Sequence, residues 1–279
     1  MIKILNKVIP NTIITETRFY ISHLVVALYA KIKKINYIHV EHGSSLVKDG
    51  GTIIKLIATI YDYTFGRLLI KLAKQVKARS YSAQKFSLSV LKAKKVTVEI
   101  IMPKVDWPPN NNIPSDHFNL LYLGRVERAK GVFELVDSIQ YLNKASYGVH
   151  LDMVGFGSAE KELHRYINKQ KLTKFITIHG KVNKSNVGEY YSKADIFILP
   201  SYTEGLPVTL LEAIVSKNVC IVTNVGDMAK IVSNNDYVIQ IESLTPHTLA
   251  KKIGSIIKNY KNHKQYFEEL RKKLIHSLQ

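Results

Sequence analysis

Short apolar runs rich in β-branched residues alternate with longer amphipathic segments along the whole chain. In the first part of the chain, the apolar runs predict strands at Asn11–Glu16, Tyr37–Glu41, Ala78–Tyr81 and Val96–Ile101. The amphipathic segments between them predict helices at about residues 18–34, 52–77 and 82–93. Buried strands that alternate with helices are typical of a parallel sheet covered on both faces, so the pattern predicts an α/β fold.

The alternation becomes more regular in the second part of the chain. Its apolar runs predict strands at Leu120–Leu123, Val149–Val154, Ile176–His179, Ile196–Leu199, Cys220–Thr223 and Tyr237–Ile239. Helices are predicted at about residues 129–143, 158–170, 185–193, 207–217, 227–232 and 245–259, with a last helix at 263–278. Ligands of open α/β sheets bind at the carboxyl ends of the strands, so we expect functional residues in the turns that follow them.

A proline-rich segment separates the two parts. Four of the eight prolines lie between Pro103 and Pro114, and proline can continue neither a helix nor a central strand. A chain of 279 residues is long enough for two domains. We therefore expect a first domain over residues 1–105, a linker over 106–117, a second domain over 118–262 and a closing helix over 263–279.

Composition excludes several classes of protein. Hydrophobic residues make up 46% and charged residues 22% of the chain, which excludes a disordered protein. A single cysteine excludes a disulfide framework and a multi-cysteine metal site. The longest apolar stretch, Phe19–Ala30, is shorter than the roughly 20 residues that a membrane-spanning helix needs. The first residues show no export-signal pattern, so we expect a cytoplasmic protein.

The chain is strongly basic, and the charge is uneven. Its net charge is +18, and residues 1–113 contribute 18 basic and 6 acidic residues. A basic face attracts nucleic acid, anionic lipid or phosphorylated substrates; a lysine-rich composition with a solvated surface is the alternative. The segment 53–77 is amphipathic, and Arg67, Lys71 and Lys74 share one helical face. This face is typical of a helix on an anionic membrane surface, although a packed helix with solvated lysines would also produce it.

Two glycine-containing turns follow the first strands of the second part. In the first turn, Gly124 ends a strand, and Arg125 and Lys130 follow before a helix. The guanidinium fork of Arg and the point charge of Lys together suit a diphosphate; two solvated cations are the alternative. The second turn contains Gly155 and Gly157 but lacks the third glycine of a dinucleotide fingerprint. It suits a loop whose backbone approaches a neighbour closely.

The turn after the strand that ends near Pro200 carries two carboxylates. Glu204 precedes Gly205-Leu206-Pro207, and Pro207 suits the first position of a helix, which leaves free amide groups to bind an anion or sugar hydroxyls. Glu212 lies within that helix among apolar residues, where an unpaired carboxylate is costly. A carboxylate can accept two hydroxyl groups of a sugar. The alternatives are a favourable charge near the helix start for Glu204 and a solvent-facing position for Glu212.

The motif Glu204-x7-Glu212, preceded by Gly124-Arg125-x4-Lys130-Gly131, resembles the donor half of the retaining GT-B glycosyltransferases of family 4, also called glycosyl transferases group 1. The resemblance runs from about residue 119 to 260 and more weakly from 11 to 105. It implies two Rossmann-like, doubly wound parallel-sheet domains. The first methionine falls near the middle of the family's acceptor domain, so we expect the N-terminal domain to be incomplete.

The resemblance also implies roles for individual residues. Arg125 and Lys130 would hold the donor pyrophosphate without a metal ion or another cofactor, and Glu212 would bind the ribose hydroxyls. Glu204 would contact the transferred sugar. The donor-site backbone would come from Gly124, Gly155, Gly180, Gly205, Leu206 and Pro207, with Gly180 near the nucleobase. In the first part, Val40-Glu41-His42-Gly43-Ser44 resembles the acceptor-side loop, which makes His42 the candidate for the reaction centre; a structural histidine is the alternative.

The implied reaction moves a sugar from a nucleotide-sugar to an acceptor hydroxyl with retained configuration. Retention by double displacement needs an enzymic nucleophile, and we identify none, so we expect front-face attack. The implied acceptor is a glycan or a lipid-linked saccharide of cell-surface polysaccharide biosynthesis, used at the inner face of the cell membrane. A non-catalytic nucleotide-sugar-binding fragment, a basic membrane-surface adaptor and a sugar-nucleotide epimerase are the alternatives. The chain lacks nucleic-acid motifs, so we expect no nucleic-acid partner.

The sequence departs from the family pattern at two turns of the second part. Asp227 follows Gly226 where many relatives carry a second glycine. The end of the helix near Ser216-Lys217-Asn218 lacks the usual glycine before the next strand. Both departures concern the geometry of a turn and leave the chemistry of the site unchanged.

Overall fold

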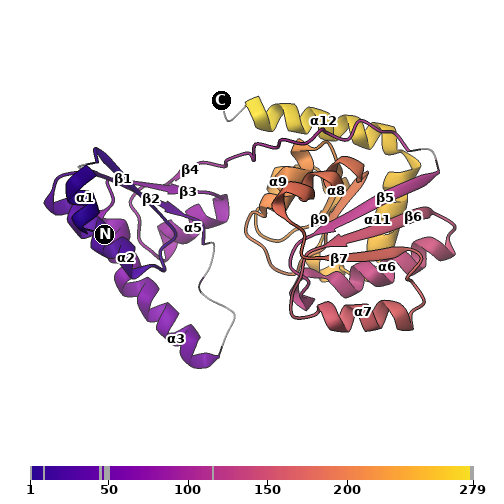
Figure 1. The fold of residues 1–279 in the computed structure, drawn as a ribbon, viewed down its shortest axis with the longest axis horizontal. Helices are drawn as coiled ribbons and strands as arrows, with labels where there is room; N and C mark the ends of the chain where they lie inside the picture. The colour runs from indigo at the N-terminus through magenta and orange to yellow at the C-terminus, as the bar shows by residue number, and fades with distance from the viewer. Residues whose placement is uncertain (1, 9, 44–45, 47–50, 115, 277–279) are drawn as a thin grey trace. The chain divides into compact units, whose positions relative to one another are not determined.

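A computed structural model describes residues 2–8, 10–43, 46, 51–114 and 116–276. The chain forms two compact units, Met1–Ile101 and Met102–Gln279 (Figure 1). Each unit is built on a parallel sheet, which confirms the α/β fold class. No helix within the described residues is both long enough and apolar enough to cross a membrane.

The first unit has a four-stranded parallel sheet in the order β1-β2-β3-β4. The strands are β1 (Thr12–Glu16), β2 (Asn36–Glu41), β3 (Gln75–Ala78) and β4 (Thr97–Val98). The helices are α1 (Ile2–Val8), α2 (Ile21–Ile32), α3 (Thr52–Tyr61), α4 (Arg67–Leu72) and α5 (Tyr81–Ser89), with a π-helical turn at Asp62–Gly66 between α3 and α4. One core cluster joins α2 to β1 and β2, and a second joins α4 and α5 to β3.

The boundary between α4 and β3 differs from the prediction. The helix predicted to continue to residue 77 ends at Leu72, and the strand begins at Gln75, three residues earlier than expected. The reason is a local alternation, because Val76 and Ala78 are buried whereas their neighbours are not. Tyr81, predicted to end the strand, instead begins α5, since the Oγ of Ser80 caps that helix by accepting a hydrogen bond from the backbone N–H of Ala83.

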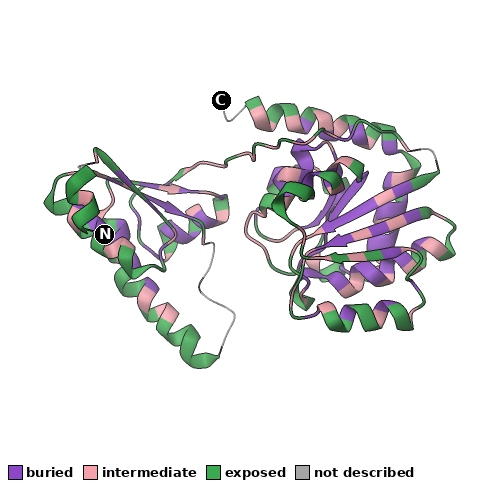
Figure 2. Cartoon of the chain, viewed as in Figure 1, coloured by how far each residue is buried: buried purple, intermediate pink, exposed green. Residues whose placement is uncertain are grey.

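The second unit has a six-stranded parallel sheet in the order β10-β9-β8-β5-β6-β7. The strands are β5 (His117–Leu123), β6 (Gly148–Val154), β7 (Ile176–Gly180), β8 (Ile196–Leu199), β9 (Val219–Thr223) and β10 (Val238–Ile239). The helices are α6 (Val132–Lys144), α7 (Glu160–Lys169), α8 (Val187–Lys193), α9 (Val208–Val215), α10 (Met228–Val232), α11 (Pro246–Lys258) and α12 (Tyr260–His276). Every residue of β8 and β9 is buried (Figure 2), as expected for central strands covered on both faces.

The strand order of this second sheet creates a topological switch point. From β5 the chain proceeds outward through β6 and β7, and it then returns to form β8 on the other side of β5. The carboxyl ends of β5 and β8 are therefore adjacent, and the loops that follow these two strands leave the sheet in opposite directions. In open α/β sheets this crevice is the usual place for a ligand.

The proline-rich segment belongs to the second unit and packs against the rest of it. The ring of Trp107 stacks on Tyr191 with a centroid distance of 5.6 Å and an interplanar angle of 8°. Its Nε1 donates a hydrogen bond to the Oγ of Ser216 at 2.8 Å. Asn110 is buried, and its Nδ2 donates to the carbonyl of Ala194 at 2.5 Å. These contacts make Trp107 and Asn110 part of the packing of the second unit.

Candidate active site

The candidate site lies at the switch point, where the loops after β5 and β8 pack together. Gly131 adopts a left-handed conformation with φ of 67°, and a Cβ there would lie 2.0 Å from the carbonyl oxygen of Pro200. The backbone N–H of Tyr202 donates to the carbonyl of Ala129 at 2.9 Å. Because only glycine permits this approach, the loop that carries Lys130 is held against the loop that carries Glu204.

Lys130 and Glu204 form an ion pair at this contact. The Nζ of Lys130 lies 2.7 Å from Oε1 of Glu204 and donates to the carbonyl of Thr203 at 3.0 Å. Lys130 is only 7% exposed, and the Oγ of Ser201 donates to the same Oε1 at 2.9 Å. The arrangement fixes a charged pair at the switch point, in which two oxygen atoms hold the ammonium of Lys130 in place.

Arg125 is placed differently from Lys130. Its side chain is 65% exposed and pairs with Glu127, with Nη1 and Oε1 2.8 Å apart. Its carbonyl accepts a hydrogen bond from the Oη of the buried Tyr122 at 2.6 Å, so the backbone is anchored while the guanidinium faces solvent. Exposed ion pairs contribute little free energy, so the guanidinium can leave Glu127 for a stronger anion at small cost.

Three glycines predicted to line the donor site meet at the ends of β5, β6 and β7. The backbone N–H of Gly124 donates to the carbonyl of Val154 at 3.0 Å, and the N–H of Gly155 donates to the carbonyl of Gly180 at 2.9 Å. Gly155 has φ of 135°, and a Cβ there would lie 1.8 Å from the carbonyl oxygen of Gly124. Backbone atoms therefore line this part of the site, because the glycines have no side chains.

Glu212 lies on α9 and is half-buried rather than solvent-facing. The Oη of Tyr191 donates a hydrogen bond to its Oε2 at 2.9 Å. Burial raises the pKa of Glu212, whereas the hydrogen bond from Tyr191 and the charge of Lys184 lower it less strongly. A carboxylate has about four acceptor positions, and Tyr191 uses one of them on Oε2, which leaves a polar group suited to hydroxyl groups of a ligand.

The start of α9 differs from the prediction by one residue. Pro207 is the N-cap, with extended backbone at φ of −72° and ψ of 130°, and the helix begins at Val208. The preceding residues Gly205 and Leu206 are half-buried. The carbonyl of Gly205 accepts a hydrogen bond from the backbone N–H of Asp227 at 2.9 Å, which ties this loop to the turn after β9. The loop between Glu204 and the helix therefore has a fixed course.

The two turns that depart from the family pattern are both well formed. At the end of α9, Lys217 adopts the left-handed conformation, with φ of 62°, that glycine would otherwise supply. Its Nζ donates to Oδ1 of Asn111 at 2.8 Å and lies 3.5 Å from Oε1 of Glu268. In the other turn, Asp227 is fully buried and holds Gly205 through its backbone N–H.

His42 belongs to the first unit, where it directly follows β2. Its Nε2 lies 3.7 Å from Oε2 of Glu16, and both side chains are exposed. The backbone N–H of Gly43 donates to Oε1 of Glu41 at 2.6 Å, so the chain after His42 is tied to the end of the strand. Ser44, the last residue of the predicted loop motif, lies outside the described residues.

A buried network of charges lies behind His42. Arg18 is 1% exposed. Its Nε donates to Oδ1 of Asp62 at 2.5 Å, and its Nη1 donates to Oε1 of Glu41 at 3.0 Å. Burial would raise the pKa of Glu41, but its hydrogen bond with His39 and the charge of Arg18 hold it below its ordinary value. Both carboxylates are fully buried, so the network forms a closed structural unit.

Several residues of these two regions were missed by the sequence interpretation. Tyr191 and Ser201 hold the two carboxylates of the second unit, and Arg18 and Asp62 support the loop of His42. Tyr191 lies in the helix predicted at about residues 185–193, but the helical pattern does not indicate its contact with Glu212. Arg18 and Asp62 lie 44 residues apart, and only the fold brings them together.

Comparison with known proteins places this geometry in a family. Residues 104–273 match the model of the family described as Glycosyl transferases group 1. A putative teichuronic acid biosynthesis glycosyltransferase of Bacillus subtilis is 31% identical over 141 residues, which cover 50% of this chain and 33% of that protein. An uncharacterized glycosyltransferase of Methanocaldococcus jannaschii is 27% identical over 277 residues, which cover 95% of this chain and 70% of that protein. The chain thus spans only part of the length of these relatives.

Solved structures of glycosyltransferases share the fold. Sucrose-phosphate synthase from Thermosynechococcus elongatus has a TM-score of 0.79 at 18% identity, covering 98% of this chain and 71% of that chain. Anabaena HepE in complex with UDP and glucose has a TM-score of 0.71 at 15% identity, covering 99% of this chain and 80% of that chain. These likenesses confirm the predicted GT-B fold.

Proposed function

Because this chain belongs to the glycosyl transferases group 1 family, we propose that it transfers a sugar from a nucleotide-sugar to an acceptor hydroxyl with retention of configuration. The observation that carries the proposal is the nearly buried Lys130 ammonium held by Glu204 at the switch point of a parallel sheet. Anabaena HepE, which has the same fold, is described in complex with UDP-glucose. Its ligand is of the class that the cation, the backbone wall and the carboxylates of this site would bind.

The two cations would act on the leaving group. Cleavage of the donor bond places negative charge on the diphosphate, and positive groups already held at that place stabilise the charge without reorganisation. Lys130 is positioned in advance by Glu204 and Thr203, whereas Arg125 would turn from Glu127 to the diphosphate when the donor binds. We propose that these side chains, rather than a metal ion or another cofactor, balance the developing charge.

The carboxylates would position the donor. Glu212, fixed by Tyr191, would accept hydroxyl groups of the ribose. Glu204 would contact the transferred sugar together with the backbone of Gly205 to Pro207, and it would remain paired with Lys130 on one oxygen. Gly180, whose carbonyl is already bonded to Gly155, would lie near the nucleobase.

The acceptor side of the proposal rests on the first unit. His42 would lie near the reacting sugar, and the leaving phosphate would take the proton of the attacking hydroxyl. We propose a glycan or a lipid-linked saccharide as the acceptor, in the biosynthesis of a cell-surface polysaccharide. The basic, apolar surface of the first unit would hold the protein peripherally at the inner face of the membrane.

Calorimetric titration tests donor binding directly. UDP, GDP and ADP would be titrated into the full chain, and the nucleotide that binds best would be titrated into Arg125→Ala/Lys130→Ala. Loss of both cations should weaken binding by about 100-fold, because two charge-assisted contacts disappear. The matched control is Lys251→Ala/Lys258→Ala, which removes two exposed cations from α11 of the same unit. Unchanged nucleotide affinity in the Arg125→Ala/Lys130→Ala variant would refute the assigned donor site.

Release of the nucleoside diphosphate from its sugar conjugate separates catalysis from binding. When the full chain is incubated with UDP-glucose or the corresponding sugar conjugate of the best nucleotide, water should replace the acceptor hydroxyl and take the sugar, which liberates the nucleoside diphosphate. His42→Ala should slow this release without changing nucleotide affinity. Tight nucleotide binding without any release would contradict the transferase proposal and leave a nucleotide-sugar-binding protein.

A further inference from the structure

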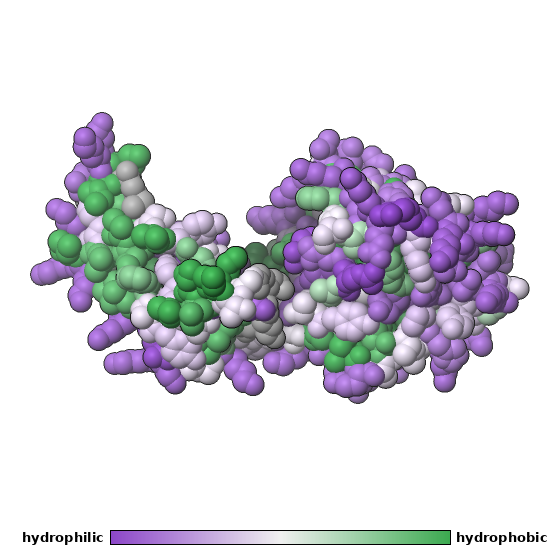
Figure 3. Space-filling view, turned by 90° about the horizontal axis from the view of Figure 1, so that it is seen from below, coloured by the Kyte–Doolittle hydropathy of each residue, from purple (hydrophilic) through white to green (hydrophobic). Residues whose placement is uncertain are grey.

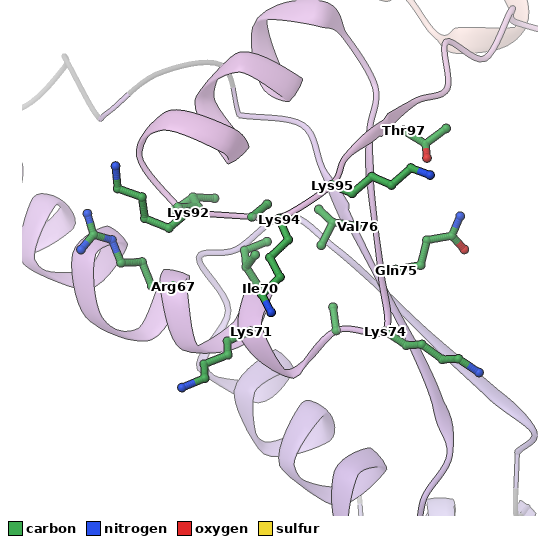
Figure 4. A pocket seen from close by; sticks show the side chains of 13 residues that line it. Arg67, Ile70, Lys71, Lys74, Gln75, Val76, Lys92, Lys94, Lys95 and Thr97 are labelled. Atoms are coloured by element: carbon green, nitrogen blue, oxygen red, sulfur yellow. The ribbon is translucent and has the colours of Figure 1, made fainter.

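The first unit contains a cavity at the end of its sheet where β3 and β4 begin, opposite the end that carries the loop of His42. The cavity has a volume of about 760 Å³ and lies beside Gln75 and Val76, which begin β3, and Thr97, which begins β4 (Figure 4). His42, in contrast, follows the carboxyl end of β2. Because the strands are parallel, the cavity and the candidate reaction centre lie at opposite ends of the sheet and can have separate functions.

The cavity is lined by positive charge. Six of its 13 lining residues are cationic and none is acidic. The cations are Arg67, Lys71, Lys74, Lys92, Lys94 and Lys95. Among the described residues, no ion pair joins any of these six to a carboxylate. An anion would relieve their mutual repulsion, so the charge favours a phosphate-bearing ligand.

Two separate segments supply these cations. Arg67 and Lys71 come from α4, whereas Lys92, Lys94 and Lys95 come from the connection between α5 and β4. Arg67 is fixed in the wall, because its Nε donates to the carbonyl of Val90 at 3.0 Å. Figure 4 shows the side chain of Lys94 at the centre of the group, with the charged ends of Lys71, Lys74, Lys92 and Lys95 directed outward around it. The fold therefore concentrates charge that the sequence distributes over two segments.

The floor of the cavity is apolar. It consists of the apolar lining residues Ile70, Ala73, Val76, Leu91 and Ala93, most of which are buried. An anion attached to hydrocarbon would cover the part of this floor that faces the cavity, whereas a free phosphate offers no apolar group to do so. An apolar floor with a cationic rim therefore suits an amphiphilic anion better than a small inorganic one.

The preceding helix supplies a second, apolar surface. No residue of α3 is buried. Its exposed apolar side chains, with those of the following turns, are Ile53, Ile54, Leu56, Ile57, Ile60, Tyr63, Phe65 and Leu68. Figure 3 shows hydrophobic side chains gathered over the first unit, while the second unit is mainly hydrophilic. Exposed apolar groups beside a basic rim are the pairing that anchors a protein at an anionic bilayer surface.

We propose that this cavity binds the phosphate of an anionic phospholipid headgroup while the apolar side chains of α3 enter the acyl boundary. The cationic rim would neutralise the phosphate, and the floor would pack against the first carbons of the lipid. The inference rests on the peripheral membrane association proposed above. It is independent of donor binding in the second unit, so each can fail without the other.

Vesicle sedimentation of the full chain tests the cavity. Phosphatidylcholine vesicles with and without phosphatidylglycerol would be compared at low and high salt. The chain should sediment only with phosphatidylglycerol present, and less at high salt. Lys92→Glu/Lys94→Glu/Lys95→Glu should reduce vesicle affinity by about 100-fold or more, because each lysine near an anionic surface contributes about fivefold. The control, Lys251→Glu/Lys258→Glu/Lys261→Glu, makes the same change in net charge on exposed positions of the second unit and should still sediment.

Further arms separate the outcomes. Undiminished sedimentation of the Lys92→Glu/Lys94→Glu/Lys95→Glu variant would overturn the assignment of the cavity, and absence of sedimentation of the unaltered chain would overturn the lipid ligand. Inorganic phosphate that binds the unaltered chain but not this variant, without vesicle binding, would identify a free phosphate as the ligand instead. Denaturant titration of the variant checks the folding of the first unit, and nucleotide titration checks the second unit, where donor binding should be unchanged. Ile53→Ser/Ile57→Ser should weaken vesicle binding while leaving the cavity intact.

Discussion

The two units differ in how they pair the cations that follow their parallel strands. In the second unit, Lys130 contacts one carboxylate oxygen and one carbonyl, and the exposed Arg125 lies in the same loop after β5. In the first unit, Arg18 contacts two buried carboxylates and lies over the rings of Phe19 and Phe86 at 4.3 and 4.4 Å. The same architecture therefore holds a cation with one carboxylate at a loop contact in one unit, and a cation saturated by two buried carboxylates in the other.

A third buried cation shows the cost of incomplete pairing. Lys264 of α12 is 4% exposed, and its Nζ has no hydrogen-bond partner among the described residues. Burial lowers the pKa of Lys264 to about 8, although the charge of Asp195 opposes this shift. Among the described residues, Arg18 thus has two carboxylate partners, Lys130 has one, and Lys264 has only the ring of Tyr260, 5.9 Å from its Nζ. Burying a charge is costly unless its partners complete the interaction, so replacing each cation should have a different effect.

Replacing Arg18, which breaks the saturated network, should lower the stability of the protein more than any of the changes that follow. Arg18→Met leaves Glu41 and Asp62 buried without their cation, which should lower the free energy of unfolding of the first unit by about 3–5 kcal/mol. Denaturant titration with hydrogen exchange in β1 and β2 would measure the loss. Arg18→Met/Glu41→Gln/Asp62→Asn, which removes all three charges, should recover much of it. Equal losses in both variants would show that charge pairing is not the cause.

The contribution of this network to stability should also depend on pH. The pKa of Glu41 in the folded chain lies below its ordinary value of 4.5. Its contribution to stability is therefore complete above pH 4.5 and is lost as the pH falls through the lowered pKa. Arg18→Met should remove part of this acid dependence, because the hydrogen bond with His39 also lowers the pKa of Glu41; unfolding curves at a series of acid pH values would show the change.

Separating the two loops of the open site should have the next largest effect. Gly131→Ala puts a Cβ 2.0 Å from the carbonyl oxygen of Pro200 at a residue with φ of 67°. Strain and overpacking should together cost about 2–4 kcal/mol of stability and should weaken nucleotide binding by displacing Lys130. Denaturation and calorimetry measure the two effects. Gly51→Ala, where a Cβ would meet nothing within 4 Å, is the control and should be nearly neutral.

Replacing the unpaired cation should raise stability. Lys264 binds its proton less readily in the folded chain, where its pKa is about 8, than in the unfolded chain, where it is 10.5. The free-energy cost of burying its charge is therefore fully present below pH 8 and disappears as the pH rises to 10.5. Lys264→Met should therefore stabilise the chain at pH 7 by about 1–3 kcal/mol. The gain should shrink at pH 10. Lys261→Met, at an exposed position of the same helix, should show no such pH dependence in denaturant titration.

The smallest expected change concerns the ribose contact. Glu212→Gln keeps an oxygen that can accept the hydrogen bond from Tyr191 but removes the negative charge. Nucleoside diphosphate affinity should fall by about tenfold, while binding of inorganic pyrophosphate should stay the same. Because the pKa of Glu212 is raised above its ordinary value of 4.5, nucleotide affinity should also decrease as the pH falls toward this raised pKa. Calorimetry at two pH values measures both effects.

Motifs within one strand–turn–helix unit could be predicted from the sequence alone. The loop of Arg125 and Lys130 follows β5, and Glu204 and Glu212 flank the start of α9, as their spacing predicts. Local geometry decides these positions, because a parallel sheet places each such turn at the same edge. The family resemblance rests on the same local motifs, which explains why it could be recognised without the structure.

Contacts between distant segments were decided only by the tertiary structure. The strand order brings Lys130 to Glu204 across 74 residues, and it joins Arg18 to Asp62 across 44. The cationic cavity combines α4 with the connection before β4. The sequence shows these charges but does not show that they line one cavity. Periodicity in a single segment carries no information about which strands become neighbours. Chemistry was therefore predictable where it is local, whereas pairing, burial and the shape of the sites required the fold.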